Sequence, residues 1–237
     1  MDAKSVIRMD PLNGRTGVAT SRPVGGGNSE VYLQLQPGES VILRAFSDRV
    51  VKEPAWPDWR VSRPAVEISG RWRVEFLSGG PTLPPKFSTT RLESWTELGG
   101  EEAQSFAGTA RYSISFDAPD AAQQEWELSL GKVCQSARVR LNGRDLGTLI
   151  APPFRVLVKG LKPTGNKLEV EVTNVSANAI RYYDREGVKW KNFHDINFVN
   201  LNYRPFDASN WSLTDSGLLG PVTLTAVQPL NPLEAGK

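Results

Sequence analysis

The sequence predicts an all-β protein built as an antiparallel β-sandwich, and the pattern of its apolar residues is the main reason. Apolar and polar residues alternate in about nine short segments, which is typical of strands that bury one face. No window keeps apolar residues at the helical spacing i, i+3, i+4 and i+7 through several turns. The chain also carries 21 Gly and 17 Pro, and residues of this kind separate short strands with turns.

The N-terminal part is expected to contain one hairpin. Residues 1–28 include the run Gly25-Gly26-Gly27 and are expected to be poorly ordered or bound at a sheet edge. Residues 31–35 and 41–45 both alternate, and Pro37-Gly38 lies between them. Because Pro-Gly favours a chain reversal, this arrangement predicts a hairpin.

The segment that follows is expected to be an extended strap. Residues 46–64 hold Trp56 and Trp59 among several prolines, and prolines disfavour a central strand. The two indoles are expected either to form a stacking platform or to pack against a neighbouring domain of a longer protein. The sequence therefore predicts two parts: a tail, hairpin and strap over residues 1–64, and a β-sandwich over residues 65–230.

The sandwich segment contains seven further alternating strands. Their apolar series are Trp72/Val74/Phe76, Tyr112/Ile114/Phe116, Trp126/Leu128/Leu130, Ala137/Val139/Leu141, Phe154/Val156/Val158, Leu168/Val170/Val172 and Val222/Leu224. Trp72 and Trp126 belong to these series and are expected in the core. Asn142-Gly143 predicts a type I′ hairpin turn, because both residues tolerate positive φ. A second turn is expected at residues 162–166.

Composition excludes several classes of function. The chain has one Cys and one His, which allows no internal disulfide and no cluster of Cys or His ligands around a metal. Lys and Arg number 28 against 26 Asp and Glu, so no excess positive charge indicates a nucleic-acid partner. No apolar run is long enough to predict a membrane span. Cys134 lies at the start of a strand and is expected to be a small buried apolar residue rather than a partner of His194 in catalysis.

Several short phrases carry a family resemblance. They are Trp72-Arg-Val-Glu-Phe76, Ser94-Trp95, Phe106-Ala-Gly-Thr-Ala-Arg-Tyr112, Leu128-Ser-Leu-Gly-Lys-Val133, Val139-Arg-Leu-Asn-Gly143 with Gly147, Pro153-Phe154, Gly165-Asn-Lys-Leu-Glu-Val170 and Thr173-Asn174. In this order they resemble the jelly-roll, sugar-binding domain of glycoside hydrolase family 2 and the galactose-binding-like modules. Three later phrases, Asn178-Ala-Ile-Arg181, Trp190-Lys-Asn-Phe-His-Asp195 and Ser216-Gly-Leu-Leu-Gly-Pro-Val222, are similar to the C-terminal end of the large alpha-L-rhamnosidases of glycoside hydrolase family 106.

The resemblance, which covers residues 30–227, implies an accessory carbohydrate-binding module. In that family the catalytic carboxylates lie in a separate barrel upstream of the matched segment, and such a barrel takes about 250 residues by itself. The implied partners are therefore a saccharide and the missing catalytic barrel of a parent enzyme. No cofactor is expected, although galactose-binding-like folds often hold a structural calcium ion. Family members generally act outside the cytoplasm, whereas this chain carries no signal peptide, so its localisation stays open.

The long segment from Asn174 to Trp211 lacks clean periodicity, and long structured loops are often functional. Residues 182–211 within it are the predicted binding region, because they are rich in aromatic and polar side chains. Sugars need aromatic rings for their C–H faces and polar groups for their hydroxyls. The predicted contact residues are Tyr182, Asp184, Trp190, His194, Asp195, Tyr203, Arg204 and Trp211. The alternative is that the rings form a small core beneath a loop and the polar side chains cap turns.

Other functions compete with sugar binding. The chain could act as a small glycoside hydrolase through a pair of carboxylates drawn from Asp184, Glu186 and Asp195. It could instead be a purely structural or interaction domain that adds a strand from residues 1–64 to another chain.

Overall fold

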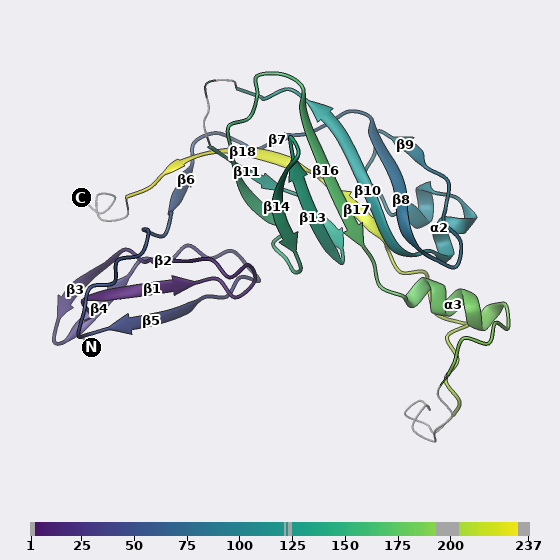
Figure 1. Ribbon diagram of the computed structural model, residues 1–237, viewed down its shortest axis with the longest axis horizontal. Coiled ribbons are helices and arrows are strands. Elements are labelled where there is room, and N and C mark those ends of the chain that lie inside the picture. The colour runs from purple at the N-terminus through teal and green to yellow at the C-terminus, as the bar shows by residue number, and fades with distance from the viewer. Residues whose placement is uncertain (1–2, 121, 123–124, 193–203, 232–237) are drawn as a thin grey trace.

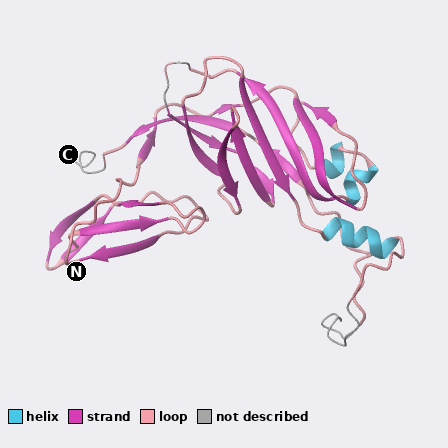
Figure 2. Ribbon diagram, viewed as in Figure 1, coloured by secondary structure: helices cyan, strands magenta, loops and turns pink. Residues whose placement is uncertain are grey.

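The computed structural model describes residues 3–120, 122, 125–192 and 204–231. Two β-sheets pack face to face, and a smaller sheet from the N-terminal residues lies beside them (Figures 1 and 2). Every pairing between named strands in the described chain is antiparallel. The predicted all-β antiparallel sandwich is confirmed.

The sandwich consists of two sheets of unequal size. In the described chain the larger sheet runs β14 (Arg144–Leu149), β13 (Ser136–Leu141), β16 (Asn166–Thr173), β10 (Ala107–Phe116), β8 (Trp72–Gly80), β9 (Phe87–Thr89). The smaller sheet runs β15 (Arg155–Lys159), β11 (Glu125–Ser129), β18 (Thr223–Pro229), β6 (Trp59–Val61), and β7 (Val66–Glu67) also pairs with β18. A separate ribbon joins β12 (Lys132–Cys134) to β17 (Gly217–Gly220). As a result β14 and β15 are both edge strands.

The core lies between the two sheets and follows the predicted alternation. Trp72 and Trp126 are 1% and 2% exposed, which confirms their predicted place in the core. The other buried residues of the strands alternate in the same way and include Val74, Phe76, Tyr112, Ile114, Leu128, Val139, Leu168, Val170 and Leu224. Burying this apolar surface is the main force that holds the sheets together. Cys134 is also buried, as predicted.

Two predicted turns lie at the same end of the larger sheet and bond to each other. Asn142 and Gly143 have φ values of 53° and 81°, so both take the positive values that a type I′ turn requires. The Asn142 side chain accepts a hydrogen bond from the Lys167 N–H (2.9 Å) and donates one to Asn166 Oδ1 (3.0 Å). Both turn predictions are therefore confirmed.

The N-terminal residues differ from prediction. They form a sheet of β2 (Thr16–Val18), β1 (Ser5–Met9) and β5 (Ile42–Phe46), here called the N-terminal sheet, and a hairpin of β3 (Ser21–Gly25) and β4 (Asn28–Val31). The predicted hairpin of residues 31–35 and 41–45 is wrong, because β5 pairs with β1 and β4 pairs with β3. The expectation of a poorly ordered or edge-bound start is also wrong for β1, which is buried in the middle of its sheet.

The predicted strap forms a short strand and packs within the chain. Within it, β6 pairs with β18 at the edge of the sandwich. Trp56 is only 8% exposed, and the guanidinium carbons of Arg8 and Arg15 lie 4.4 and 5.0 Å from its ring centroid. Trp56 therefore packs inside this chain and offers no open face for stacking. The division of the chain at residue 64 stays a prediction.

Three short helices occur in the described chain, although the sequence shows almost no helical periodicity. They are α1 (Trp95–Leu98), α2 (Glu101–Ser105) and α3 (Ala177–Arg185). The longest, α3, is missed because it buries only Asn178 and Ala179, so it lacks an apolar stripe. Among the described helices, none has the length and apolar character needed to cross a membrane.

Candidate functional site

A buried polar network fixes helix α3 to one end of the sandwich. The N–H of Ser216 donates to Ser94 Oγ (3.0 Å), and Asn174 Nδ2 donates to Ser216 Oγ (2.9 Å). Asn178 bonds Thr214 twice, accepting from its N–H and donating to its carbonyl, both at 2.8 Å. Phrases that are far apart in the sequence but share the family resemblance therefore meet at the base of α3. Their role there is to position the helix.

Asp184, a predicted contact residue, is engaged by three donors on the segment that follows α3. Its carboxylate accepts from the Ala208 N–H (2.7 Å), the Trp190 indole N–H (2.7 Å) and Lys191 Nζ (2.9 Å). Burial pushes the pKa of Asp184 up, but these donors outweigh burial and hold the pKa below the usual range of an aspartate. Asp184 therefore stays ionised and ties the loop to the helix.

Aromatic side chains stack beside Asp184. The Phe206 ring lies 6.0 Å from that of Trp190 and 5.6 Å from that of Trp211, in edge-to-face contact with each. Arg181 Nε donates to the Trp211 carbonyl (2.6 Å), which fixes the far end of this segment on α3. Trp190 and Phe206 are half-buried, as expected of a small core, whereas Trp211 is 42% exposed.

The surface between α3 and this segment forms an open depression of about 610 Å³, here called the α3 hollow. Its lining residues are Arg181, Asp184, Arg185, Ser209, Asn210 and Trp211. An exposed indole and several hydrogen-bonding side chains therefore converge on one place. Four of these residues, Arg181, Arg185, Ser209 and Asn210, are not among the predicted contacts, because only the helix brings them next to Trp211.

The remaining predicted residues fall in several places. Tyr182 is on α3, 37% exposed, with its ring 5.9 Å from that of Tyr183. Glu186 and Arg204 are both exposed, Glu186 at the C-terminal end of α3. Predicted residues outside the described part of the chain are His194, Asp195 and Tyr203.

A second cavity system lies between the N-terminal sheet and the sandwich. One cavity of about 460 Å³ and another of about 660 Å³ share the lining residues Arg15, Trp56, Trp59, Leu146, Val156 and Leu157. Because they share these walls, we treat them as one N-terminal groove. Its sandwich wall comes from the edge strands β14 and β15. Figure 1 shows the N-terminal sheet and α3 at opposite ends of the molecule.

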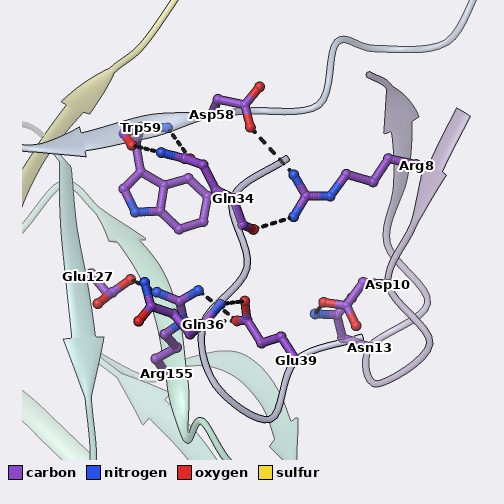
Figure 3. A network of polar contacts seen from close by, with 10 residues as sticks. All are labelled: Arg8, Asp10, Asn13, Gln34, Gln36, Glu39, Asp58, Trp59, Glu127 and Arg155. Atoms are coloured by element: carbon purple, nitrogen blue, oxygen red, sulfur yellow. Dashed lines mark hydrogen bonds and ion pairs between the residues drawn. The ribbon is translucent and has the colours of Figure 1, made fainter. Parts of the chain in front are cut away.

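Arg155 joins the two walls of the N-terminal groove. Its guanidinium donates to Glu39 Oε1 from Nη2 (2.6 Å) and Nε (3.1 Å), and from Nη1 to Glu127 Oε2 (2.7 Å). Glu39 belongs to the loop before β5, whereas Glu127 and Arg155 belong to the sandwich (Figure 3). This contact therefore fastens the N-terminal residues to the sandwich.

Arg8 forms a second polar contact in the groove (Figure 3). Its Nη2 donates to the Gln34 carbonyl (2.7 Å), and its Nη1 lies 3.5 Å from a carboxylate oxygen of Asp58. Burial raises the pKa of Asp58, and the Arg8 charge opposes that rise. The Gln34 side chain in turn bonds both the N–H and the carbonyl of Trp59. Only the two tryptophans among prolines, Trp56 and Trp59, point to this groove in the sequence.

Metal chemistry finds no support in the described residues. Within them, no group of three or more His, Cys, Asp or Glu side chains is arranged to hold a metal ion. Cys134 is a free thiol whose burial raises its pKa, which disfavours the thiolate that a nucleophile needs.

Comparison with known proteins identifies the wider group. No family model matches the sequence. The chain is 34% identical over 183 residues to a putative beta-glucuronidase of Formosa agariphila, an alignment covering 68% of this chain and 16% of that protein. It superposes on the structure of a rhamnosidase from Novosphingobium sp. PP1Y with a TM-score of 0.71 and 25% identity, covering 96% of this chain and 21% of the rhamnosidase. This chain is a glycoside-hydrolase-related domain.

The glycoside-hydrolase-related domain corresponds to a small part of each of these larger proteins. A GH2 beta-galacturonidase from Eisenbergiella tayi, whose structure is bound to glycerol, gives a TM-score of 0.44 at 18% identity, covering 72% of this domain and 25% of that chain. The domain spans 16% of the Formosa agariphila protein and 21% of the rhamnosidase.

Proposed function

We propose that this domain is an accessory carbohydrate-binding module of a rhamnosidase-type glycoside hydrolase and is not catalytic by itself. The observation that carries the proposal is the superposition of 96% of the chain on only 21% of a rhamnosidase. Nearly all of the domain thus corresponds to one part of a much larger hydrolase. The module would be the jelly-roll, galactose-binding-like domain at the C-terminal end of a family 106 enzyme, and its partner would be the catalytic barrel of that enzyme.

The α3 hollow is the proposed saccharide site. The exposed Trp211 ring would stack on the apolar C–H face of a sugar, while Arg181, Arg185 and Asn210 would bond its hydroxyls. Tyr182 and Arg204 lie on the exposed surface of the same region and are proposed as further contacts. Trp190 and Asp184 would position the loop. Contacts from His194, Asp195 and Tyr203 stay predictions.

The carboxylates of this region support binding rather than hydrolysis. A glycosidase acid needs a raised pKa so that it carries a proton at neutral pH. The lowered pKa of Asp184 does not suit that acid role. The other carboxylate of a glycosidase pair is ionised and must reach the sugar or a water, whereas the Asp184 carboxylate already accepts from three donors. Glu186 follows two positions later, and residues two apart on a helix do not face each other. The competing proposal of a small glycoside hydrolase using Asp184, Glu186 and Asp195 therefore has less support.

Isothermal titration calorimetry against rhamnose- and galactose-containing oligosaccharides tests the proposal. The domain should bind at least one of them, and Trp211→Ala should weaken binding about tenfold, or ~1.4 kcal/mol. Trp211→Phe should restore part of the affinity, and Leu83→Ala, at an exposed apolar residue outside the α3 hollow, should leave it unchanged. If no saccharide binds at millimolar concentration, the domain is a structural support for the barrel and the proposal fails.

A further inference from the structure

The larger cavity of the N-terminal groove is lined by two arginines that form no direct ion pair within the described part of the chain. Its charged lining residues are Arg15, Asp58, Glu125, Arg144 and Lys159. Asp58 pairs with Arg8, and Lys159 pairs with Glu125. Arg15 and Arg144 are left, and neither forms an ion pair with another residue in the described ranges. Burial lowers the pKa of Arg15 and the charge of nearby Asp10 opposes that change, although no ion pair joins the two side chains. Two guanidinium groups therefore line one cavity of about 660 Å³ without a directly bonded carboxylate.

These arginines come from opposite walls and are held in different ways. Arg15 precedes β2 of the N-terminal sheet, and its guanidinium carbon lies 5.0 Å from the centre of the Trp56 ring, which orients the side chain. Arg144 begins β14, directly after the tight turn at Gly143, and is exposed. The contact between Arg155 and Glu39 fixes the spacing of the walls. An anion in the cavity could therefore be reached from both sides.

The remaining lining fits a sugar ring. Trp59, Leu146 and Val156 supply apolar surface for C–H groups. The adjoining cavity of about 460 Å³ continues the groove and offers the hydroxyl groups of Ser40 and Thr148 for neighbouring sugar residues. A groove of this kind suits a ligand that continues beyond one ring. A cavity of this volume is also within the range of small-ligand sites.

We infer that the N-terminal groove binds an acidic saccharide, with the anionic group of one sugar residue held between Arg15 and Arg144. Guanidinium groups bind carboxylates and sulfate esters through paired N–H donors, which gives the charge a fixed position. This inference rests on the proposed carbohydrate-binding function and adds a ligand class and a second site. Helix α3, which lines the α3 hollow, lies at the opposite end of the molecule from the N-terminal sheet (Figure 1), so the two sites can be tested independently.

Calorimetric titration of the whole chain with matched ligands tests the inference. The probes are an oligogalacturonide, the same oligosaccharide with its carboxylates methyl-esterified, and a sulfated neutral oligosaccharide. We expect the acid to bind at least tenfold more tightly than the ester, with an advantage that shrinks as salt is added. Tight binding of the sulfated probe in place of the uronide would identify a sulfate ester as the anion.

Substitutions of Arg15 and Arg144 test whether the preference for the acidic probe comes from these two side chains. Arg144→Ala, at an exposed position, should weaken binding of the acidic probe about fivefold or more and leave binding of the ester unchanged. Arg15→Lys keeps the charge but loses the paired donors, so it should weaken binding less than Arg15→Ala. Arg71→Ala removes an exposed arginine outside the groove and serves as the matched control. Circular dichroism of each variant checks that it is folded.

The outcomes separate this inference from the proposed function. The inference would be overturned if acid and ester bind with equal affinity, or if the Arg15 and Arg144 variants keep the full preference for the acid. In either case, binding of a neutral saccharide that depends on Trp211 would still support the α3 hollow. If neither acidic nor neutral saccharides bind, both proposals fail.

Discussion

The contact of Arg155 with Glu39 is predicted to hold the N-terminal sheet on the sandwich. The side chains of Arg155, Glu39 and Glu127 are 17%, 20% and 19% exposed, so this cluster is more protected than an ordinary surface ion pair. Exposed pairs contribute about 0.2–1 kcal/mol, and breaking a fully buried pair costs about 3–5 kcal/mol. Arg155→Ala should therefore cost about 2–3 kcal/mol, which at this chain length lowers Tm by roughly 5–10 °C.

The two glutamates give a matched pair of variants. Glu39→Gln and Glu127→Gln each remove one acidic partner of Arg155, but only Glu39 belongs to the N-terminal residues. Hydrogen exchange of the β1 and β5 amides should become faster in Glu39→Gln and in Arg155→Ala, because the N-terminal sheet then opens separately. Glu127→Gln should leave that exchange close to the wild-type rate. A Tm change below about 1 °C for Arg155→Ala, or identical amide exchange of β1 and β5 in both glutamine variants, would show that the contact of Arg155 with Glu39 does not hold the N-terminal sheet.

Three further predictions concern single positions. The folded-state pKa of Asp184 is depressed, so the ionised carboxylate stabilises the fold above the usual aspartate pKa of about 3.9, and this stabilisation is lost as pH falls below it. The Asp184→Asn variant should be less stable at pH 7, and its urea midpoint should fall less steeply than that of the wild type from pH 7 to 3. Gly217→Ala should cost about 3 kcal/mol in urea unfolding, because φ is +105° and the new Cβ would lie 2.2 Å from the Tyr112 hydroxyl. Gly143→Ala should cost about 1 kcal/mol in the same assay, because φ is +81° in an open turn.

The sandwich could be predicted from the sequence because its signals are local. Alternation within a strand, as around Trp72 and Trp126, indicates which face of the strand is buried. It does not indicate which strand lies beside it. The partner of a strand is not a local property. The sequence therefore predicts residues 31–35 as the partner of residues 41–45, whereas in the structure β5 pairs with β1. Helix α3 gave no periodic signal because Asn178, a polar residue, anchors it.

The candidate sites could be predicted only in part for the same reason. The sequence indicated a region rich in rings and polar groups, and Trp211 does line a hollow there. It could not show that Asp184 would be occupied by donors from residues 190–208. Arg15 and Arg144 are far apart in the sequence and line the same cavity only because a small sheet folds against two strand edges.

The most direct test of an accessory, non-catalytic module combines binding and turnover in one titration. The purified chain is titrated with rhamnose- and galacturonate-containing oligosaccharides, and each mixture is then assayed for new reducing ends. An accessory module that is not catalytic should give saturable binding with no reducing ends above the protein-free control. Release of reducing ends that Asp184→Ala or Glu186→Ala abolishes would contradict it, and so would the absence of binding to every saccharide at millimolar concentration.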